Sequence, residues 1–184
     1  MHEALFWAQC FYFFLPAYIA NTIPVIAARF QILPRLAIPV DGGRNWFGPR
    51  KTIRGFLLGT TGGVVSAYYQ AKLHVFGPFA AFSLTDYSQT NPFALGFLLG
   101  FGSLAGDSLG SFVKRRLNKR PGEHLWFLDE LNMAAGAILC MAILYPTPSA
   151  RKAYVAIACM LITFAWHTTA AKTAYLLRIR EARW

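Results

Sequence analysis

GDSLGSFVKRRLNKRPGEHLWFLDELN, residues 106–132, places two acids, Asp107 and Asp129, inside apolar segments. Between them lies a run of cations, which comprises Lys114, Arg115, Arg116, Lys119 and Arg120. An ionised carboxylate in a membrane-length apolar segment costs several kcal/mol unless it has a partner, so such acids are functional candidates. Two acids that flank a basic loop indicate a divalent-metal site beside an anion site, suited to a nucleotide triphosphate or a phospholipid head group.

The composition is typical of a membrane protein. Of the 184 residues, 55% are apolar and 14% are charged, whereas a soluble globular domain is about 25% charged. The formal net charge of +10 also suits a nucleic-acid-binding protein. Basic loops between membrane helices explain that charge better, so no nucleic-acid partner is expected. The length fits one membrane-embedded domain over residues 1–184.

Five apolar stretches are long enough to cross about 30 Å of hydrocarbon as helices. They cover residues 4–28, 54–77, 92–113, 125–145 and 152–177. The expected fold is therefore an all-α, polytopic membrane helical bundle of about five transmembrane helices. Most lysines and arginines lie in the first loop, the third loop and the C-terminal tail. The positive-inside rule then places the N-terminus outside and the C-terminus in the cytoplasm, in a multi-pass protein of the cell membrane.

Glycines and cysteines in these spans indicate packing rather than chemistry. Gly55, Gly59 and Gly63 are four residues apart, and a further series in the third span comprises Gly96, Gly100, Gly102, Gly106 and Gly110. Small residues at this spacing let helix backbones approach closely, so spans two and three are expected to pack together. Cys10, Cys140 and Cys159 lack CxxC spacing and are expected to form no disulfide or zinc site.

The first loop is a candidate phosphate site. Gly43 and Gly48 followed by Lys51 and Thr52 nearly match a P-loop, but two residues are inserted and no strand precedes them, so a P-loop fold is rejected. A glycine-rich turn still exposes N–H groups, and Lys51 with Arg54 supplies positive charge. The alternative, which the sequence supports equally, is that these cations serve only to set the topology or to contact anionic lipid head groups.

In the third span, Asp107, Ser111 and Lys114 share one helical face. The carboxylate suits a hard cation, and the hydroxyl and ammonium groups suit phosphate oxygens. The alternative is an Asp107–Lys114 ion pair that only stabilises the bundle. In the fourth span, Asp129 and Asn132 share a face, so Asp129 is expected to meet Asp107 across a helix interface.

Two further polar residues lie near the cytoplasmic ends of their spans. Asn21, in the first span, either contacts substrate or joins two helices by hydrogen bonds. His167, in the fifth span, is either a packing residue or a functional one. The sequence leaves both alternatives open.

Motifs over nearly the whole chain resemble those of the CDP-archaeol synthases, integral-membrane enzymes related to phosphatidate cytidylyltransferases. The matching residues are Leu15-Pro16-Ala17-Tyr18-Ile19-Ala20-Asn21, Gly48-Pro49, Lys51-Thr52, Arg54-Gly55, Gly106-Asp107, Ser111-Phe112, Lys114-Arg115-Arg116, Pro121-Gly122, Leu128-Asp129, His167 and Ala174-Tyr175. The chain departs from the family at Asn132, where a further acid is common, and at Ala171, where an Asn is usual.

The resemblance implies that Asp107 and Asp129 hold Mg²⁺ and that these acids, with Lys114, form the catalytic set. It implies contacts to the CTP phosphates from Lys51, Arg54, Lys114 and Arg115, with accessory contacts from Asn21, Thr52 and Ser111. Asn132 and His167 are additional candidates.

The implied reaction joins CTP to the phosphate of a membrane lipid and gives a CDP-lipid and pyrophosphate. The lipid is either archaetidic acid (2,3-bis-O-geranylgeranylglycerol phosphate) or phosphatidic acid, whose hydrocarbon chains would contact similar apolar side chains. The second pKa of a phosphate monoester is about 6, so at neutral pH the group is mostly a dianion and already a nucleophile. The alternative function is a small non-catalytic transporter or lipid-binding protein that uses the acids as an ion path. Whether the chain forms a homo-oligomer stays open.

Overall fold

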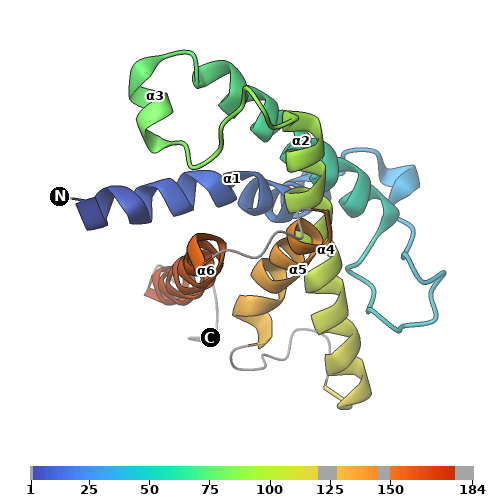
Figure 1. Ribbon diagram of the computed structural model, residues 1–184. Coiled ribbons are helices and arrows are strands. Elements are labelled where there is room, and N and C mark those ends of the chain that lie inside the picture. The colour runs from blue at the N-terminus through green and yellow to red at the C-terminus, as the bar shows by residue number, and fades with distance from the viewer. Residues whose placement is uncertain (1, 120–127, 145–149, 177–184) are drawn as a thin grey trace.

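The computed structural model describes residues 2–119, 128–144 and 150–176, and within these ranges the chain contains helices and no strand. Helices α1, α2, α4, α5 and α6 are the long elements, α3 is short, and η1 is a single 3-10 turn (Figure 1). Their bounds are α1 His2–Arg29, η1 Pro34–Leu36, α2 Ile53–Leu73, α3 Gly77–Phe82, α4 Pro92–Arg116, α5 Leu128–Leu144 and α6 Ala150–Leu176. The all-α prediction is confirmed for the described residues.

Each of the five predicted spans corresponds to one long helix, but two of the predicted ends are wrong. Helix α2 ends at Leu73, not at 77, and the short helix α3 was not predicted. Proline fixes its own φ and lacks an N–H donor, so the Gly77-Pro78 pair begins a new helix instead of continuing the old one. Helix α4 continues one turn beyond residue 113, to Arg116.

Polar caps fix where α2 and α4 begin. The Thr52 hydroxyl accepts a hydrogen bond from the Gly55 N–H at 3.1 Å. The Asn91 side-chain oxygen accepts from the N–H groups of Phe93 and Ala94, at 2.9 and 3.3 Å. Such caps satisfy N–H groups that have no partner within the helix. They therefore set the register in which α2 and α4 present their residues.

Helix α4 lies between α2 and α5 (Figure 1), and glycines bring the three backbones together. A Cβ atom added to Gly63 of α2 would lie 2.9 Å from the Gly100 Cα of α4. On the other side of α4, a Cβ at Gly106 would lie 2.8 Å from the Gly136 Cα of α5. The prediction that spans two and three pack through small residues is confirmed.

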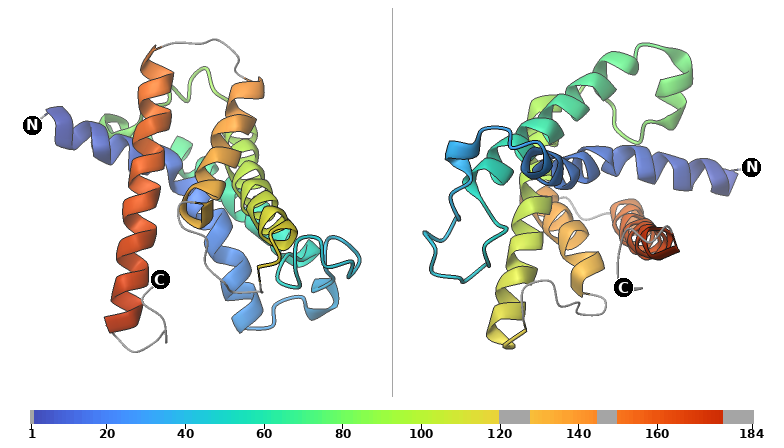
Figure 2. Two further views of the ribbon diagram at one scale, coloured as in Figure 1. Left: turned by 90° about the horizontal axis from the view of Figure 1, so that it is seen from below. Right: turned by 180° about the vertical axis from the view of Figure 1, so that it is seen from behind.

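The core combines small residues with a few large side chains, and α6 packs beside α1 and α5 (Figure 2). Phe14, Leu95 and Leu99 are fully buried, as are Cys10 and Cys159. The Cys159 thiol points at the Cys10 carbonyl, 3.7 Å away, and all three cysteines are free. Cys10 and Cys159 are thus packing residues, as predicted.

The outer surface of α4 is apolar instead of polar. Phe93, Phe97, Phe101, Leu109 and Val113, spaced by four or eight residues, are all exposed, whereas the opposite face of the same helix is buried and rich in glycine. A soluble helix shows the reverse arrangement. Small residues inside and large apolar residues outside are the arrangement of a helix that packs on protein and faces lipid.

Within the described ranges, two helices, α1 and α4, contain a stretch that is long and apolar enough to cross a membrane, at Glu3–Arg29 and Pro92–Arg116. The apolar stretches in the described parts of α5 and α6 are shorter, at Leu131–Ala142 and Lys152–Trp166. The number of five spans and the orientation across the membrane therefore remain predictions.

Candidate functional site

An ion pair joins the start of α2 to the middle of α4. The Lys51 ammonium lies against the Asp107 carboxylate, with the two side chains 19% and 40% exposed. The sequence predicts a phosphate contact for Lys51, and no spacing or motif indicates that Lys51 meets Asp107. The partly exposed pair brings the first loop, residues 30–52, onto the face of α4 that carries the predicted metal ligand.

Backbone bonds hold the end of the first loop in place. Residues 38–40 run antiparallel to residues 51–53, because the Val40 N–H donates to the Lys51 carbonyl and the Ile53 N–H donates to the Ile38 carbonyl, both at 2.9 Å. The buried Arg54 donates from Nη1 to the Ile32 carbonyl at 3.2 Å. Lys51 is therefore presented from a braced segment rather than from a free loop.

Asp41, which the sequence analysis did not single out, organises the middle of this loop. One carboxylate oxygen accepts from the Gly43 N–H at 3.0 Å, and the other accepts from Trp46 and Phe47 at 2.7 and 3.1 Å. Gly42 and Gly43 have φ values of 64° and 86°, which favour glycine. The Asp-Gly-Gly sequence is a turn signal that could have indicated this role.

We expect Asp41→Asn to loosen the turn at neutral pH. The N–H groups of Phe47, Gly43 and Trp46 lower the pKa of the Asp41 carboxyl below its ordinary value of 3.8. The contribution of the ionised carboxylate to the stability of the turn is therefore fully present above about pH 4. It is lost as the pH falls through the lowered pKa of the folded state. The hydrogen-exchange protection factors of those three amides, which correct for the pH dependence of the intrinsic exchange rate, should be lower in Asp41→Asn at pH 7 and unchanged between pH 7 and 5 in wild type. Unchanged exchange in the variant would contradict this role. Asp86→Asn in the next loop is the matched control.

The second half of α4 contacts the same loop. The ring centroids of Phe112 and Phe47 are 5.8 Å apart, and the Arg116 guanidinium lies 4.8 Å from the centre of the Phe112 ring. Gly48, with φ 87°, is buried, and a Cβ atom added to it would lie 3.9 Å from the Arg115 Nε. The last turn of α4 also contains Lys114, so Lys114, Arg115 and Arg116 extend the positive charge from Lys51 along α4.

Three of the residues that are predicted to contact substrate form hydrogen bonds within their own helix or at its start. The Ser111 hydroxyl donates to the Asp107 carbonyl at 3.0 Å, and the Asn21 amide donates to the Ala17 carbonyl at 3.3 Å. Thr52 caps α2. A hydroxyl or amide that bonds its own helix keeps spare acceptor or donor capacity, so these bonds leave a substrate contact available.

Helix α5 runs antiparallel to α4 with Asn132 at the contact. Gly106 lies against the Asn132 carbonyl, and Gly110 lies against the Asn132 side chain. Asp129 is one turn earlier in α5, so its backbone is level with the α4 turn that follows Gly110. The side chains of Asp129 and His167 lie outside what the structure describes, and so does Arg120. Among the described residues, no three His, Cys, Asp or Glu side chains gather around one point.

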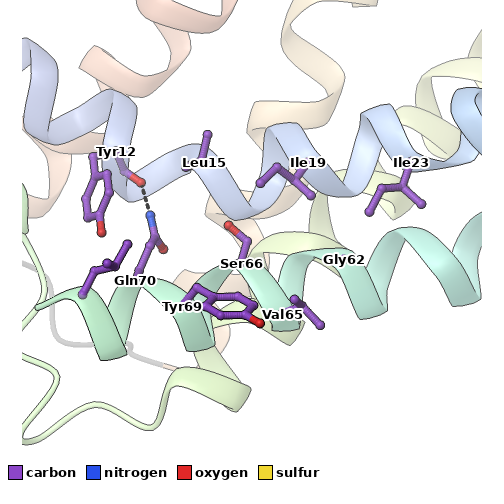
Figure 3. A pocket seen from close by; sticks show the side chains of 10 residues that line it. Tyr12, Leu15, Ile19, Ile23, Gly62, Val65, Ser66, Tyr69 and Gln70 are labelled. Atoms are coloured by element: carbon purple, nitrogen blue, oxygen red, sulfur yellow. Dashed lines mark hydrogen bonds between the residues drawn. The ribbon is translucent and has the colours of Figure 1, made fainter.

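A groove of about 320 Å³ between α1 and α2 is separate from this site (Figure 3). Its walls are mainly apolar and come from Tyr12, Leu15, Ile19, Ile23, Gly62, Val65, Ser66, Tyr69, Gln70 and Leu73. Gln70 closes one end, where its side chain donates to the Tyr12 carbonyl. No predicted site residue lines the groove, and it follows the second half of α2, away from Lys51.

The comparisons with known proteins agree with one another. The family profile described as CarS-like, CDP-archaeol synthase, matches residues 3–184. A CDP-archaeol synthase of Pyrococcus furiosus is 38% identical over 152 residues, which are 79% of this chain and 78% of that protein. The Methanopyrus kandleri CDP-archaeol synthase is 32% identical over 173 residues, 94% of this chain and 91% of that protein.

A solved structure of similar fold supports the same relationship. It is described as an intramembrane enzyme for archaeal membrane lipids biosynthesis, and it is 29% identical to this chain. The superposition has a TM-score of 0.61 and covers 87% of this chain and 90% of the other. The similarity therefore extends to the arrangement of the helices.

Proposed function

The chain belongs to the CDP-archaeol synthase family, and we propose that it transfers CMP from CTP to the phosphate of an archaeal-type membrane lipid, giving a CDP-lipid and pyrophosphate. The observation that carries the proposal is the meeting of Lys51 and Asp107 beside the cations of α4. One acid and several cations lie at the same end of the α2–α4 pair. Such a site suits a triphosphate that carries a cation.

The chemistry needs little from the protein as an acid or a base. A lipid phosphate monoester is mostly a dianion at pH 7, because its second pKa is about 6. One of its oxygens attacks the α-phosphorus of CTP, and the bond from that phosphorus to the oxygen of the leaving pyrophosphate breaks. The main barrier is the approach of two anions, so positioning and charge neutralisation dominate. Lys51, Lys114 and Arg115 supply fixed positive charge for this step.

Asp107 and Asp129 are the residues we propose for Mg²⁺. Magnesium is commonly held by one or two carboxylates together with substrate phosphates, and it neutralises phosphate charge when bound. The donor set fits, because Asp107 presents a partly exposed carboxylate beside the Lys51 ammonium. Asn132 of α5 contacts Gly106 and Gly110 of α4, and Asp129 is one turn before Asn132, which supports Asp129 as the second ligand. Lys51 would then exchange the Asp107 carboxylate for a phosphate when nucleotide binds.

The site is proposed to face the cytoplasm of a chain that crosses the membrane about five times. The basic first loop and the basic end of α4 meet in the structure, which supports placing both on one side. The positive-inside rule assigns that side to the cytoplasm, where CTP is available. A phosphate at head-group depth reaches this end of the helices without leaving the bilayer.

Transfer of radiolabel from CTP into lipid tests the proposal. Membranes that contain the protein would be given labelled CTP, Mg²⁺ and either 2,3-bis-O-geranylgeranylglycerol phosphate or diacyl phosphatidic acid. We expect label in the lipid fraction with the ether lipid. Phosphatidic acid should also accept label if the protein recognises the lipid chains only as hydrocarbon. Absence of label with both lipids would overturn the activity. Absence of CTP binding as well would favour a transporter or lipid-binding protein.

Lys51→Met is expected to raise the KM for CTP about 10- to 100-fold, because a hydrogen bond to a charged group contributes about 1.5–3 kcal/mol. The variant keeps the length of the side chain and removes its charge. Lys72→Met is the matched control, because Lys72 lies at the other end of α2 with its ammonium 5.5 Å from the centre of the Tyr68 ring. Steady-state rates at varied CTP would measure both. An equal KM in the two variants would remove Lys51 from the phosphate site.

A further inference from the structure

The first loop exposes an unusual number of large apolar side chains. Loops on a protein surface that faces water are mostly polar. Here the exposed residues between α1 and α2 include Phe30, Ile32, Leu33, Ile38, Val40 and Trp46. The loop lies at the side of the helices in Figures 1 and 2, next to α2 and α4. Water alone is a poor environment for this surface.

Four exposed arginines alternate with these apolar residues along residues 29–50, at Arg29, Arg35, Arg44 and Arg50. The only acid in that range is Asp41, whose carboxylate is taken up by three backbone N–H groups. The Arg44 guanidinium lies 5.3 Å from the centre of the Trp46 ring. The segment therefore combines apolar surface with uncompensated positive charge.

We propose that this segment lies in the head-group layer of the membrane and binds anionic lipid head groups. Tryptophan and arginine are both favoured at that depth, where rings contact the acyl boundary and guanidinium groups contact phosphate. A water-soluble protein partner would not account for apolar residues and arginines spread along the whole segment. The proposal concerns the membrane surface and does not depend on which reaction the site performs.

The fold gives the segment a rigid form that suits this placement. Asp41 fixes residues 43–47, residues 38–40 pair with residues 51–53, and Phe47 packs on Phe112. Phe47 is thus directed at α4 while Trp46, its neighbour, is exposed. Because the same braced loop ends at Lys51, head groups held along it would be concentrated beside the site.

Fluorescence quenching in liposomes tests the depth of Trp46. The chain has five tryptophans, so the Trp46 signal is taken as wild type minus Trp46→Phe. We expect lipids brominated near the head group to reduce this signal roughly twofold or more, and aqueous acrylamide to reduce it little. Trp7→Phe is the positive control for quenching by lipid, because Trp7 lies in the α1 stretch that is apolar enough to cross a membrane and is 42% exposed, against 44% for Trp46. Strong quenching by acrylamide with none by brominated lipid would place the loop in water and overturn the proposal.

A second arm tests the charge. The lipid-dependent quenching of Trp46 should increase when zwitterionic liposomes are replaced by liposomes that contain anionic lipid, and the double variant Arg29→Gln/Arg35→Gln should lose that increase. The double variant retains Arg44, whose guanidinium lies 5.3 Å from the centre of the Trp46 ring, so this contact of the fluorophore is kept. Quenching that is indifferent to anionic lipid and to the double variant would overturn the assignment of anionic head groups.

Discussion

Asp107→Asn is expected to lower the rate of CMP transfer at least about 100-fold, the effect typical of losing one electrostatic group from a reacting site. The substitution preserves the shape of the side chain and removes its charge. Asn binds a hard cation more weakly than a carboxylate does, and it leaves Lys51 without its ionic partner. The substitution therefore weakens charge neutralisation, which is the main requirement of the proposed reaction, and the rate falls for this reason.

The fold should tolerate this substitution. Asp107 is 40% exposed, so solvent screens its ion pair, and the free energy of unfolding should change by about 1 kcal/mol or less. Asp86→Asn is the control, because the Asp86 carboxylate accepts bonds from Ser88 in the loop before α4 and is not placed in the site. Label transfer and thermal unfolding would be measured on the same samples. Asp107→Asn with half or more of the wild-type rate would remove Asp107 from the reaction.

The helices could be predicted because their signals are local. A long apolar run specifies a membrane helix by length alone, and glycines four residues apart identify the packing face. Gly63, Gly100 and Gly106 lie where that spacing predicts. The end of α2 could not be predicted, because the apolar stretch continues to residue 77 whereas the helix ends at Leu73.

The contacts of the site depend on tertiary structure and were harder to predict. Ser111 and Lys114 share a helix with Asp107, so helical spacing found them. Lys51 is 56 residues away in sequence, and only the braced loop brings it to the carboxylate. Asp41 was missed for a related reason, because a lone acid in a glycine-rich loop resembles a solvated one until its three N–H partners are seen.

Gly106→Ala should lower the free energy of unfolding by about 2 kcal/mol or more, as is typical when added volume meets atoms that cannot yield. The new methyl group would meet the Asn132 carbonyl and would lie 2.8 and 2.9 Å from the Gly136 Cα and N. All three are backbone atoms of α5, so no side-chain rotation relieves the contact. The helices must separate, and the α4–α5 interface that brings Asp129 toward the site is lost with them.

The sign of this effect distinguishes packing from helix propensity. Alanine is favoured over glycine in a helix by about 0.5–1 kcal/mol, so a Gly106 that merely faced lipid would gain stability on substitution. Gly77→Ala is the control, because a Cβ there meets nothing within 4 Å. Thermal unfolding in detergent should show Gly106→Ala well below wild type and Gly77→Ala closer to it, because only the methyl group at residue 106 meets packed backbone. If both variants match wild type, α4 and α5 do not approach as closely as this structure has them, and the Asp107–Asp129 site loses its geometric support.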